Sequence, residues 1–268
     1  MGKGKGKGKE ILHLKLSLVL PAYNEENIIS KTLDEHLSWV PPEGVELLEI
    51  LVVNDASFDR TAEILADFEA HNDLIQVITH PENCGKGAAL QTGVAAARGD
   101  IIGCVDSDLA YPPSVYPDFI EAVKGDQAHL AIGNRYHSAS DKLAEYPLVR
   151  RLASKAFRLV IRSLGISATS DTQCGIKFFA KGAASFLFAR LKSPGFLYDL
   201  DILSMASILK LKIREVPVTM QLQAESNVQV HRQLLPVFQG LLKLLNRKVY
   251  RSHSASLEKA WKQHEKNS

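Results

Sequence analysis

The sequence predicts an α/β fold in which a mostly parallel sheet carries helices on both faces. Short apolar runs alternate with amphipathic stretches of helical length, and this alternation is typical of a doubly wound sheet. The apolar runs span residues 16–24, 48–55, 75–80, 100–108 and 129–136. Ligands of such sheets bind outside the carboxyl ends of the strands. We therefore expect a cleft lined by the polar residues that end or follow these runs, namely Asn24, Asp55, Asn83, Asp106 and Asp108.

The amphipathic stretches predict helices at 24–40, 57–72 and 85–99. Asn24 is expected to cap the first helix, Ser57 or Asp59 the second, and Gly99 ends the third. The second half is less regular, with a loop, a strand and a helix over 171–191 and a helix and a strand over 198–220. Two further stretches, 146–165 and 234–252, predict basic amphipathic helices, which either cover a core or lie on a membrane surface.

Composition and charge exclude several classes of protein. The chain has 268 residues and a net charge of only +2, so we expect no nucleic-acid partner. Cys84, Cys104 and Cys174 form no C-x-x-C pair and read as reduced thiols of a cytoplasmic protein. No apolar run approaches the 18 or so residues of a membrane-spanning helix. Residues 1–10 alternate Gly and Lys and are expected to be a disordered basic tail.

Asp106-Ser107-Asp108 ends the fourth apolar run and places two carboxylates two residues apart. In an extended chain such residues point the same way, so their repulsion must be offset. One interpretation is a strand end with two solvated acids. The other is a site for Mg²⁺ or Mn²⁺, which prefer oxygen ligands. Three residues alone do not decide between them.

Two phosphate-binding patterns fail at residues 80–90. The P-loop pattern would need a Gly at His80 and a Ser or Thr at Gly87, and the dinucleotide pattern would need a Gly at Leu90. Gly85-Lys86-Gly87 nevertheless opens a helix. It can place a cation and free N–H groups near a diphosphate.

Seven motifs stand in order along the chain: LPAYNEE, ILVVNDAS, NCGKGAALQTG, DSD, IGNRY, DTQCGIKFF and YDLDIL. Together they resemble the inverting GT-A glycosyltransferases of family two, and most closely the polyprenyl-phosphate branch of that family. The resemblance covers roughly residues 14–245. It implies a GT-A (Rossmann-like) sheet, a nucleotide-sugar donor carrying UDP or GDP, and Mg²⁺ or Mn²⁺ held by Asp106 and Asp108.

The resemblance also implies roles for individual residues. The binding site of the donor nucleotide would be lined by Pro21, Ala22, Tyr23, Glu25, Asp55, Lys86 and Ser107. The acceptor phosphate would be held by Arg135, Arg150 and Ser154, while Asp171 and Gln173 would face the donor sugar. Asp199 and Asp201 would lie at the reaction centre, and Arg232 would close over the diphosphate as part of a lid.

The nature of the acceptor decides whether a general base is needed. A phosphate monoester is already ionised near neutral pH, whereas an alcohol would need a base such as Asp201 or Asp171. If Arg135, Arg150 and Ser154 are clustered and exposed, they favour a phosphate; if they are buried in ion pairs with acids, they do not. The basic amphipathic helices fit a lipid phosphate at a membrane surface.

The expected function is therefore the transfer of glucose or mannose to a polyprenyl phosphate, at the cytoplasmic face of a membrane. The catalytic domain would span 11–225, with a lid and C-terminal amphipathic helices over 226–268. Ala110 and Asn227 depart from the family pattern. Two alternatives remain: transfer to a soluble alcohol, and a non-catalytic module that binds a nucleotide sugar.

Overall fold

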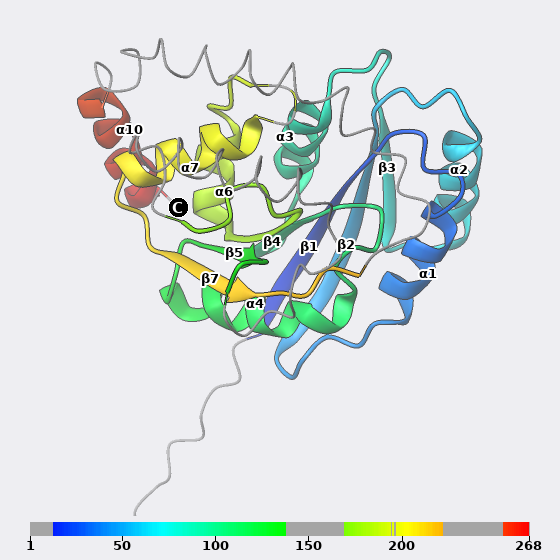
Figure 1. The fold of residues 1–268 in the computed structure, drawn as a ribbon, viewed down its shortest axis with the longest axis horizontal. Helices are drawn as coiled ribbons and strands as arrows, with labels where there is room; N and C mark the ends of the chain where they lie inside the picture. Colours follow the sequence, from blue (N-terminus) through cyan, green and yellow to red (C-terminus); the bar gives the residue numbers. More distant parts are fainter. Residues whose placement is uncertain (1–12, 138–168, 194, 196, 222–253, 268) are drawn as a thin grey trace, which may run out of the picture.

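The fold is built around one seven-stranded sheet, shown in Figure 1. The structure is a computed structural model that describes residues 13–137, 169–193, 195, 197–221 and 254–267. The strands are β1 (Leu14–Ala22), β2 (Val45–Asn54), β3 (Ile75–Thr79), β4 (Ile101–Val105), β5 (Leu130–Asn134), β6 (Ile176–Ala180) and β7 (Ile213–Pro217). The α-helices are α1 (Ile29–Ser38), α2 (Thr61–His71), α3 (Lys86–Ala96), α4 (Tyr116–Val123), α6 (Lys181–Phe188), α7 (Tyr198–Ile208) and α10 (Ser254–Asn267). Two 3₁₀ helices, Pro113–Val115 and Lys124–Asp126, flank α4.

The strand order is β3-β2-β1-β4-β6-β5-β7. Every neighbouring pair is parallel except the two that involve β6, which runs antiparallel to both β4 and β5. From β1 the chain builds outward through β2 and β3, and then returns to place β4 on the other side of β1. The carboxyl ends of β1 and β4 therefore form the point where the strand order reverses, which is where ligands of open α/β sheets bind.

Helices cover both faces of the sheet, as the sequence predicted. Residues of α1, α2 and α4 pack in one core with Leu16, Leu18 and Leu20 of β1. Residues of α3, α6, α7 and α10 pack in a second core that includes Val19 of the same strand. Figure 1 shows α4 below the sheet with α3 and α7 above it. The alternation along β1 follows from the two-residue period of a strand.

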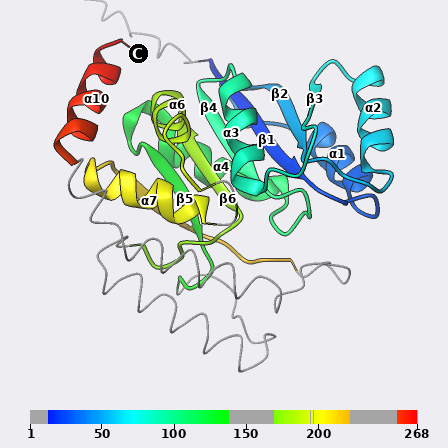
Figure 2. The same cartoon turned by 90° about the horizontal axis from the view of Figure 1, so that it is seen from above.

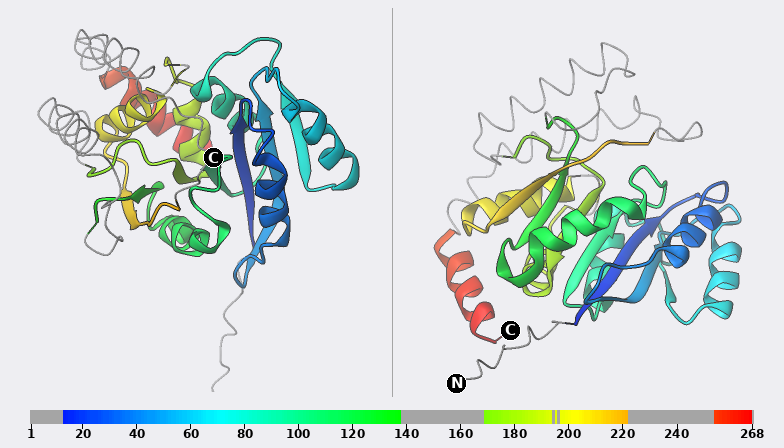
Figure 3. Two further views of the ribbon diagram at one scale, coloured as in Figure 1. Left: turned by 45° about the vertical axis from the view of Figure 1, so that its right-hand side comes forward. Right: turned by 90° about the horizontal axis from the view of Figure 1, so that it is seen from below.

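The helix α10 packs against α6, as Figure 2 shows. Trp261 of α10 meets Phe186 of α6 edge to face, with ring centroids 5.0 Å apart. Figure 3 shows the same helix from two other directions, at the far end of the sheet from β3. In the part of the chain that the structure describes, no helix is both long enough and apolar enough to cross a bilayer.

Three features differ from the sequence prediction or lie beyond it. The helix α1 begins at Ile29 because Asn24 has a φ of 56° and caps nothing; its side chain instead accepts a hydrogen bond from the Phe58 N–H at 3.0 Å. The helix α4 was not predicted. The helices predicted at 146–165 and 234–252, and with them Arg150, Ser154, Asn227 and Arg232, lie outside the described residues, as does the basic tail.

A buried glutamate fixes β4 to the rest of the sheet at the edge opposite the cleft. The side chain of Glu49 on β2 is fully buried and accepts hydrogen bonds from Ser17 Oγ at 2.6 Å and from the Arg98 backbone N–H at 2.7 Å. The Arg98 guanidinium closes over the same carboxylate at 2.7 Å. The Gly99 N–H donates to Ser17 Oγ, so β1, β2 and the turn that leads into β4 share one polar cluster.

We predict that Glu49→Gln lowers the free energy of unfolding by about 2 kcal/mol, because it removes charge-assisted hydrogen bonds. Burial raises the pKa of Glu49, but the bonds from Ser17 and Arg98 outweigh it and hold the pKa below its ordinary value. Such a group stabilises the fold above its unfolded pKa of about 4.3 and ceases to do so as pH falls through the folded pKa. Urea denaturation at neutral and acidic pH should therefore show a shallower acid-side loss in the variant. Glu46→Gln, on the exposed face of the same strand, should change neither quantity.

Candidate functional site

The carboxyl edge of the sheet gathers the polar residues that the sequence singled out. Asp55 follows β2 and Asp106 follows β4, each directly after the last strand residue. Because β6 is antiparallel to β4, it begins at this same edge, and the Gly175 carbonyl accepts a hydrogen bond from the Asp106 N–H at 3.2 Å. The segment 171–175 is thereby placed beside Asp106. The strand ends that the sequence singled out therefore lie at one edge of the sheet, as predicted.

Three carboxylates and one lysine form the centre of this edge. The Lys86 ammonium, at the start of α3, lies 2.5 Å from Asp106 Oδ1. Although burial alone would lower the pKa of Lys86, the charge of Asp106 keeps it above its ordinary value, so the lysine stays cationic. Burial and then the charge of Asp106 raise the pKa of Asp108. Burial, then the charges of Asp108 and Asp106, raise the pKa of Glu25 to about 7.

The chemistry of these side chains suits a divalent metal ion. Glu25, Asp106 and Asp108 offer carboxylate oxygens, and their mutual repulsion is only partly offset by Lys86. A glycine also makes room for one of them: a Cβ built on Gly175 would lie 2.2 Å from Asp106 Oδ2. Any side chain at position 175 would displace the carboxylate that the sequence assigns to the metal.

A buried chain of hydrogen bonds holds the loop that carries Asp106 and Asp108. Ser107 Oγ donates to the Pro21 carbonyl at 2.9 Å, and Thr32 Oγ1 donates to the Ser107 carbonyl at 2.6 Å. His36 Nδ1 donates to the Thr32 carbonyl at 2.7 Å, and Tyr116 OH lies 2.7 Å from His36 Nε2. Burial lowers the pKa of His36, so the ring is neutral and Nε2 accepts from Tyr116. Ser107, assigned to the donor site, therefore positions the loop through the chain's own hydrogen bonds.

Ala110, where the sequence departs from the family pattern, makes hydrogen bonds through its backbone. The Ala110 N–H donates to Asp108 Oδ1 at 3.0 Å, and its carbonyl accepts from the Gln221 N–H at 2.9 Å. Ala110 itself is buried. The missing side chain thus leaves Asp108 with a main-chain partner.

The residues predicted for the nucleoside divide into a buried and an exposed group. Ala22 is buried, Pro21 is half-buried, and Tyr23 is 44% exposed. The Tyr23 ring meets Phe58 edge to face with centroids 6.1 Å apart, and Phe58 is 82% exposed. The sequence analysis missed Phe58, although an aromatic residue in the loop after a buried strand was a visible signal. The two exposed rings stand at 82° to each other, so each presents a separate face at this edge.

Asp55 has a different set of partners from the one expected. The residue is 3% exposed, and its carboxylate accepts from the backbone N–H groups of Cys84 at 2.9 Å and Gly85 at 2.7 Å. His80 Nδ1 donates to the same carboxylate at 2.8 Å. The side chain of Asn83 donates to the Asp55 carbonyl. Asp55 therefore anchors the loop that leads into α3 and so helps to place Lys86.

Arg135 and the buried Asp171 form a partly buried ion pair. Two guanidinium nitrogens of Arg135 donate to the two carboxylate oxygens of Asp171 at 2.7 and 2.9 Å, and the second nitrogen also reaches the Gln173 carbonyl at 3.2 Å. Burial raises the pKa of Asp171, but Arg135 outweighs it and holds the pKa below its ordinary range. Arg135 is thus paired with an acid in this conformation, while Arg150 and Ser154, its expected partners at the acceptor phosphate, lie outside the described residues.

Asp199 and Asp201 do not share one site. They are two residues apart on α7, and helical residues at that spacing do not face each other. Asp199 forms an ion pair with Lys177 at 2.6 Å, and burial raises its pKa. Asp201 is fully buried and accepts from the Lys192 N–H at 3.3 Å. Asp201 is fully buried in this conformation, and its role at the reaction centre stays a prediction.

The sequence analysis also missed Lys177, a fully buried cation in β6. Its ammonium donates to the Cys174 carbonyl at 2.6 Å and faces Asp199. Lys177 lies on the same face of β6 as Phe179, within a strand that otherwise reads as apolar. The charges of Lys86 and Lys177 both act on Asp199, which places this pair next to the carboxylate centre.

Comparisons with known proteins point to one family for this chain. A family model described as glycosyl transferase family 2 matches residues 17–184. The dolichyl-phosphate beta-glucosyltransferase ALG5C of Trichomonas vaginalis is 31% identical over 222 residues, which are 80% of this chain and 66% of that protein. The human dolichyl-phosphate beta-glucosyltransferase is 31% identical over 217 residues, 76% of this chain and 66% of its own. The chain thus spans just under two thirds of the length of both relatives.

Solved structures share the fold. One is glucosyl-3-phosphoglycerate synthase from Mycobacterium tuberculosis, in a structure with Mn²⁺ and uridine-diphosphate-glucose. It superposes with a TM-score of 0.63 at 21% identity, covering 86% of this chain and 78% of the other. The GT-A architecture expected from the sequence is confirmed by this similarity.

We predict that Gly175→Ala weakens Mn²⁺ binding by about 10- to 100-fold, the usual cost of disturbing the support of a metal ligand. The added Cβ would clash with Asp106 Oδ2. Gly195→Ala is the matched control, because a Cβ there meets nothing within 4 Å. Electron paramagnetic resonance of free Mn²⁺ measures both. Equal Mn²⁺ affinities in the two variants would contradict the assignment of Asp106 to the metal.

We predict that Mn²⁺ affinity rises with pH through about 7, where Glu25 ionises in the metal-free protein. Below that pH the cation must displace the proton that burial and the neighbouring carboxylates stabilise on Glu25. Glu25→Gln should flatten this part of the profile, as measured by Mn²⁺ titrations at pH 6 to 8. A profile as steep as that of the wild type would show that another group is responsible.

Proposed function

The chain belongs to glycosyl transferase family 2, and from that premise we propose that it transfers a hexose from a nucleotide sugar to a polyprenyl phosphate, with inversion. The observation that carries the proposal is the convergence of Glu25, Asp106 and Asp108 with Lys86, where the strand order reverses. A diphosphate and a divalent ion would complete the charge balance of this centre.

Asp106 and Asp108 would hold the metal ion, with Glu25 beside them. A bound Mg²⁺ or Mn²⁺ supplies neutralisation of the charge that develops on the leaving nucleotide diphosphate. The structure of the synthase, which shares the fold and holds Mn²⁺ and uridine-diphosphate-glucose, supports a divalent metal ion together with a nucleotide sugar. The donor would be UDP-glucose, with a GDP-hexose as the alternative. The names of the Trichomonas and human relatives favour glucose as the sugar.

The chain's own residues would bind and orient the donor. Tyr23 and Phe58 would offer their exposed rings to the base. Lys86 would turn from Asp106 toward the diphosphate once the carboxylates are neutralised, because its position at the start of α3 places it within that centre. Asp171 and Gln173 would face the sugar from the segment that precedes β6.

The acid–base chemistry favours an acceptor that is already ionised. The two carboxylates considered as a base are poorly suited to that role: Asp201 is fully buried, and Arg135 holds the pKa of Asp171 low. A phosphate monoester needs no base near neutral pH. Since Arg135 is paired with Asp171, we propose that Arg150 and Ser154 hold the acceptor phosphate. Arg232 would close over the donor diphosphate. Peripheral binding at the cytoplasmic face of a membrane, through the basic segments 146–165 and 234–252, belongs to the same proposal.

A soluble alcohol is the second candidate acceptor, and Asp199 favours it. Burial raises the pKa of this carboxylate, which makes it a better base than Asp171. It lies beside Lys177 and within the charge field of Lys86. With an alcohol acceptor, Asp199→Asn should abolish transfer. With a phosphate acceptor it should leave a residual rate, because the nucleophile is already ionised.

The decisive test is transfer of labelled sugar from UDP-glucose or GDP-mannose to a short polyprenyl phosphate in the presence of Mn²⁺. We predict an organic-extractable product that requires metal and is lost in Asp108→Ala. Asp118→Ala, an exposed acid on α4, is the matched control and should retain transfer. If label appeared only in soluble products, the proposal of a lipid acceptor would be contradicted. Donor binding without turnover on any acceptor would leave a non-catalytic binding module.

A further inference from the structure

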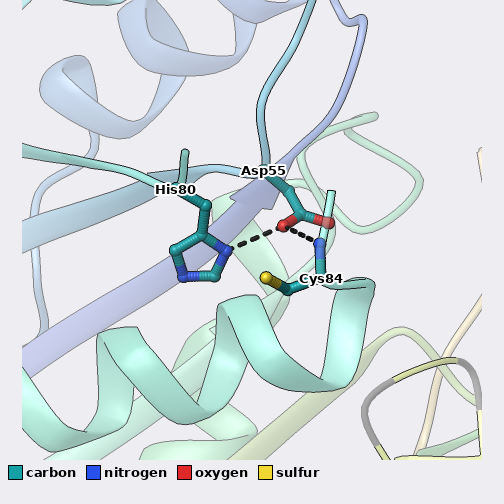
Figure 4. A group of neighbouring side chains, drawn as sticks. All are labelled: Asp55, His80 and Cys84. Atoms are coloured by element: carbon teal, nitrogen blue, oxygen red, sulfur yellow. Dashed lines mark hydrogen bonds and ion pairs between the residues drawn. The ribbon is translucent and has the colours of Figure 1, made fainter. Parts of the chain in front are cut away.

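A second cluster of metal-ligating side chains lies at the ends of β2 and β3, separate from the carboxylate centre. Asp55, His80 and Cys84 each bring one ligand atom to within 4.8 Å of the other two. Figure 4 shows the His80 ring and the Cys84 sulfur on the same side of the Asp55 carboxylate. His80 Nδ1 and Asp55 Oδ1 are already 2.8 Å apart.

The chemistry of this cluster differs from that of the carboxylate centre. An imidazole nitrogen, a carboxylate oxygen and a thiolate sulfur form a mixed ligand set that suits Zn²⁺. The Glu25, Asp106 and Asp108 site offers oxygen alone, which suits Mg²⁺ or Mn²⁺. Three protein ligands leave a fourth tetrahedral position for water or a ligand atom.

Neighbouring groups already orient two of the three ligands. His80 Nε2 lies 2.9 Å from Thr92 Oγ1 on α3, and the backbone N–H groups of Cys84 and Gly85 hold the Asp55 carboxylate. Metal-binding histidines characteristically use their second ring nitrogen in this way. When His80 Nδ1 binds a cation, the ring proton stands on Nε2 and is donated to Thr92. The ring then stays neutral, and the thiol of Cys84 releases one proton to solvent.

Cys84 is the accessible thiol of the chain. Of the three cysteines, Cys84 is exposed while Cys104 and Cys174 are buried. Burial raises the pKa of Cys104 to about 12 and that of Cys174 to about 11. A thiolate–metal signal from this protein would therefore report Cys84.

We propose that Asp55, His80 and Cys84 bind Zn²⁺ as an inhibitory site next to the donor pocket. The Asp55 carboxylate that would bind the ion is the one that holds the loop leading into α3 and Lys86. A bound Zn²⁺ takes up the Asp55 carboxylate that holds this loop, and thereby weakens binding of the nucleotide. This last consequence rests on the proposed function, whereas binding of the ion does not.

The test uses Co²⁺ as a spectroscopic substitute for Zn²⁺ on the reduced full-length chain. We expect a thiolate-to-cobalt charge-transfer band that saturates at one equivalent and is displaced by Zn²⁺. Cys84→Ser should abolish the band, and His80→Gln should weaken binding roughly tenfold or more. His71→Gln is the matched control, because His71 pairs with Asp67 at 3.4 Å on an exposed helix face. It should leave the band unchanged.

Two outcomes would overturn the site: no thiolate band in the wild type, or a band that survives Cys84→Ser. Because Cys84 is exposed, its substitution should leave the fold intact, which circular dichroism checks. Titration of UDP with and without Zn²⁺ tests the inhibition separately. We expect Zn²⁺ to weaken UDP binding in the wild type and not in Cys84→Ser; equal weakening in both would overturn the inhibitory role. A chain that shows the cobalt band but never binds UDP would refute the proposed function and leave the metal site standing.

Discussion

The ion pair between Lys86 and Asp106 is the interaction around which the candidate site is organised. Glu25 and Asp108 add negative charge to the same centre, and burial followed by the repulsion of neighbouring carboxylates raises the pKa of both. One lysine does not balance three ionised carboxylates, so the centre attracts a further cation. Its location, where β4 returns beside β1, is the one that an open α/β sheet leaves free for ligands.

The rest of the structure keeps this centre in place from two sides. At the opposite edge of the sheet, the buried Glu49 fixes the entry into β4. At the site itself, the chain of hydrogen bonds from His36 through Thr32 to Ser107 holds the aspartate loop. The open space at Gly175 then sets where Asp106 can lie. Glu49, His36, Thr32 and Ser107 are all buried, so the charges are positioned before any ligand arrives.

Local patterns in the sequence were sufficient for the fold and for part of the site. Alternating apolar runs predicted the two-faced sheet, and the D-x-D at the end of a strand predicted the acidic centre. The direction of β6 was not readable, since a five-residue apolar run carries no sign of its orientation. The pairing of Lys177 with Asp199 joins residues of β6 and α7, which only the fold brings together. Which of Asp199 and Asp201 faces Lys177 was not readable either, because it depends on how α7 is turned against the sheet.

The most direct test of this account is the affinity of Mn²⁺ for the Lys86→Met variant in the absence of nucleotide. If Lys86 neutralises the carboxylates that would otherwise bind the metal, its removal should tighten Mn²⁺ binding about tenfold, or about 1.4 kcal/mol. Lys181→Met, on α6, should leave the affinity unchanged. Unchanged or weaker Mn²⁺ binding in Lys86→Met would contradict the claim that the lysine and the metal compete for one cluster of charge.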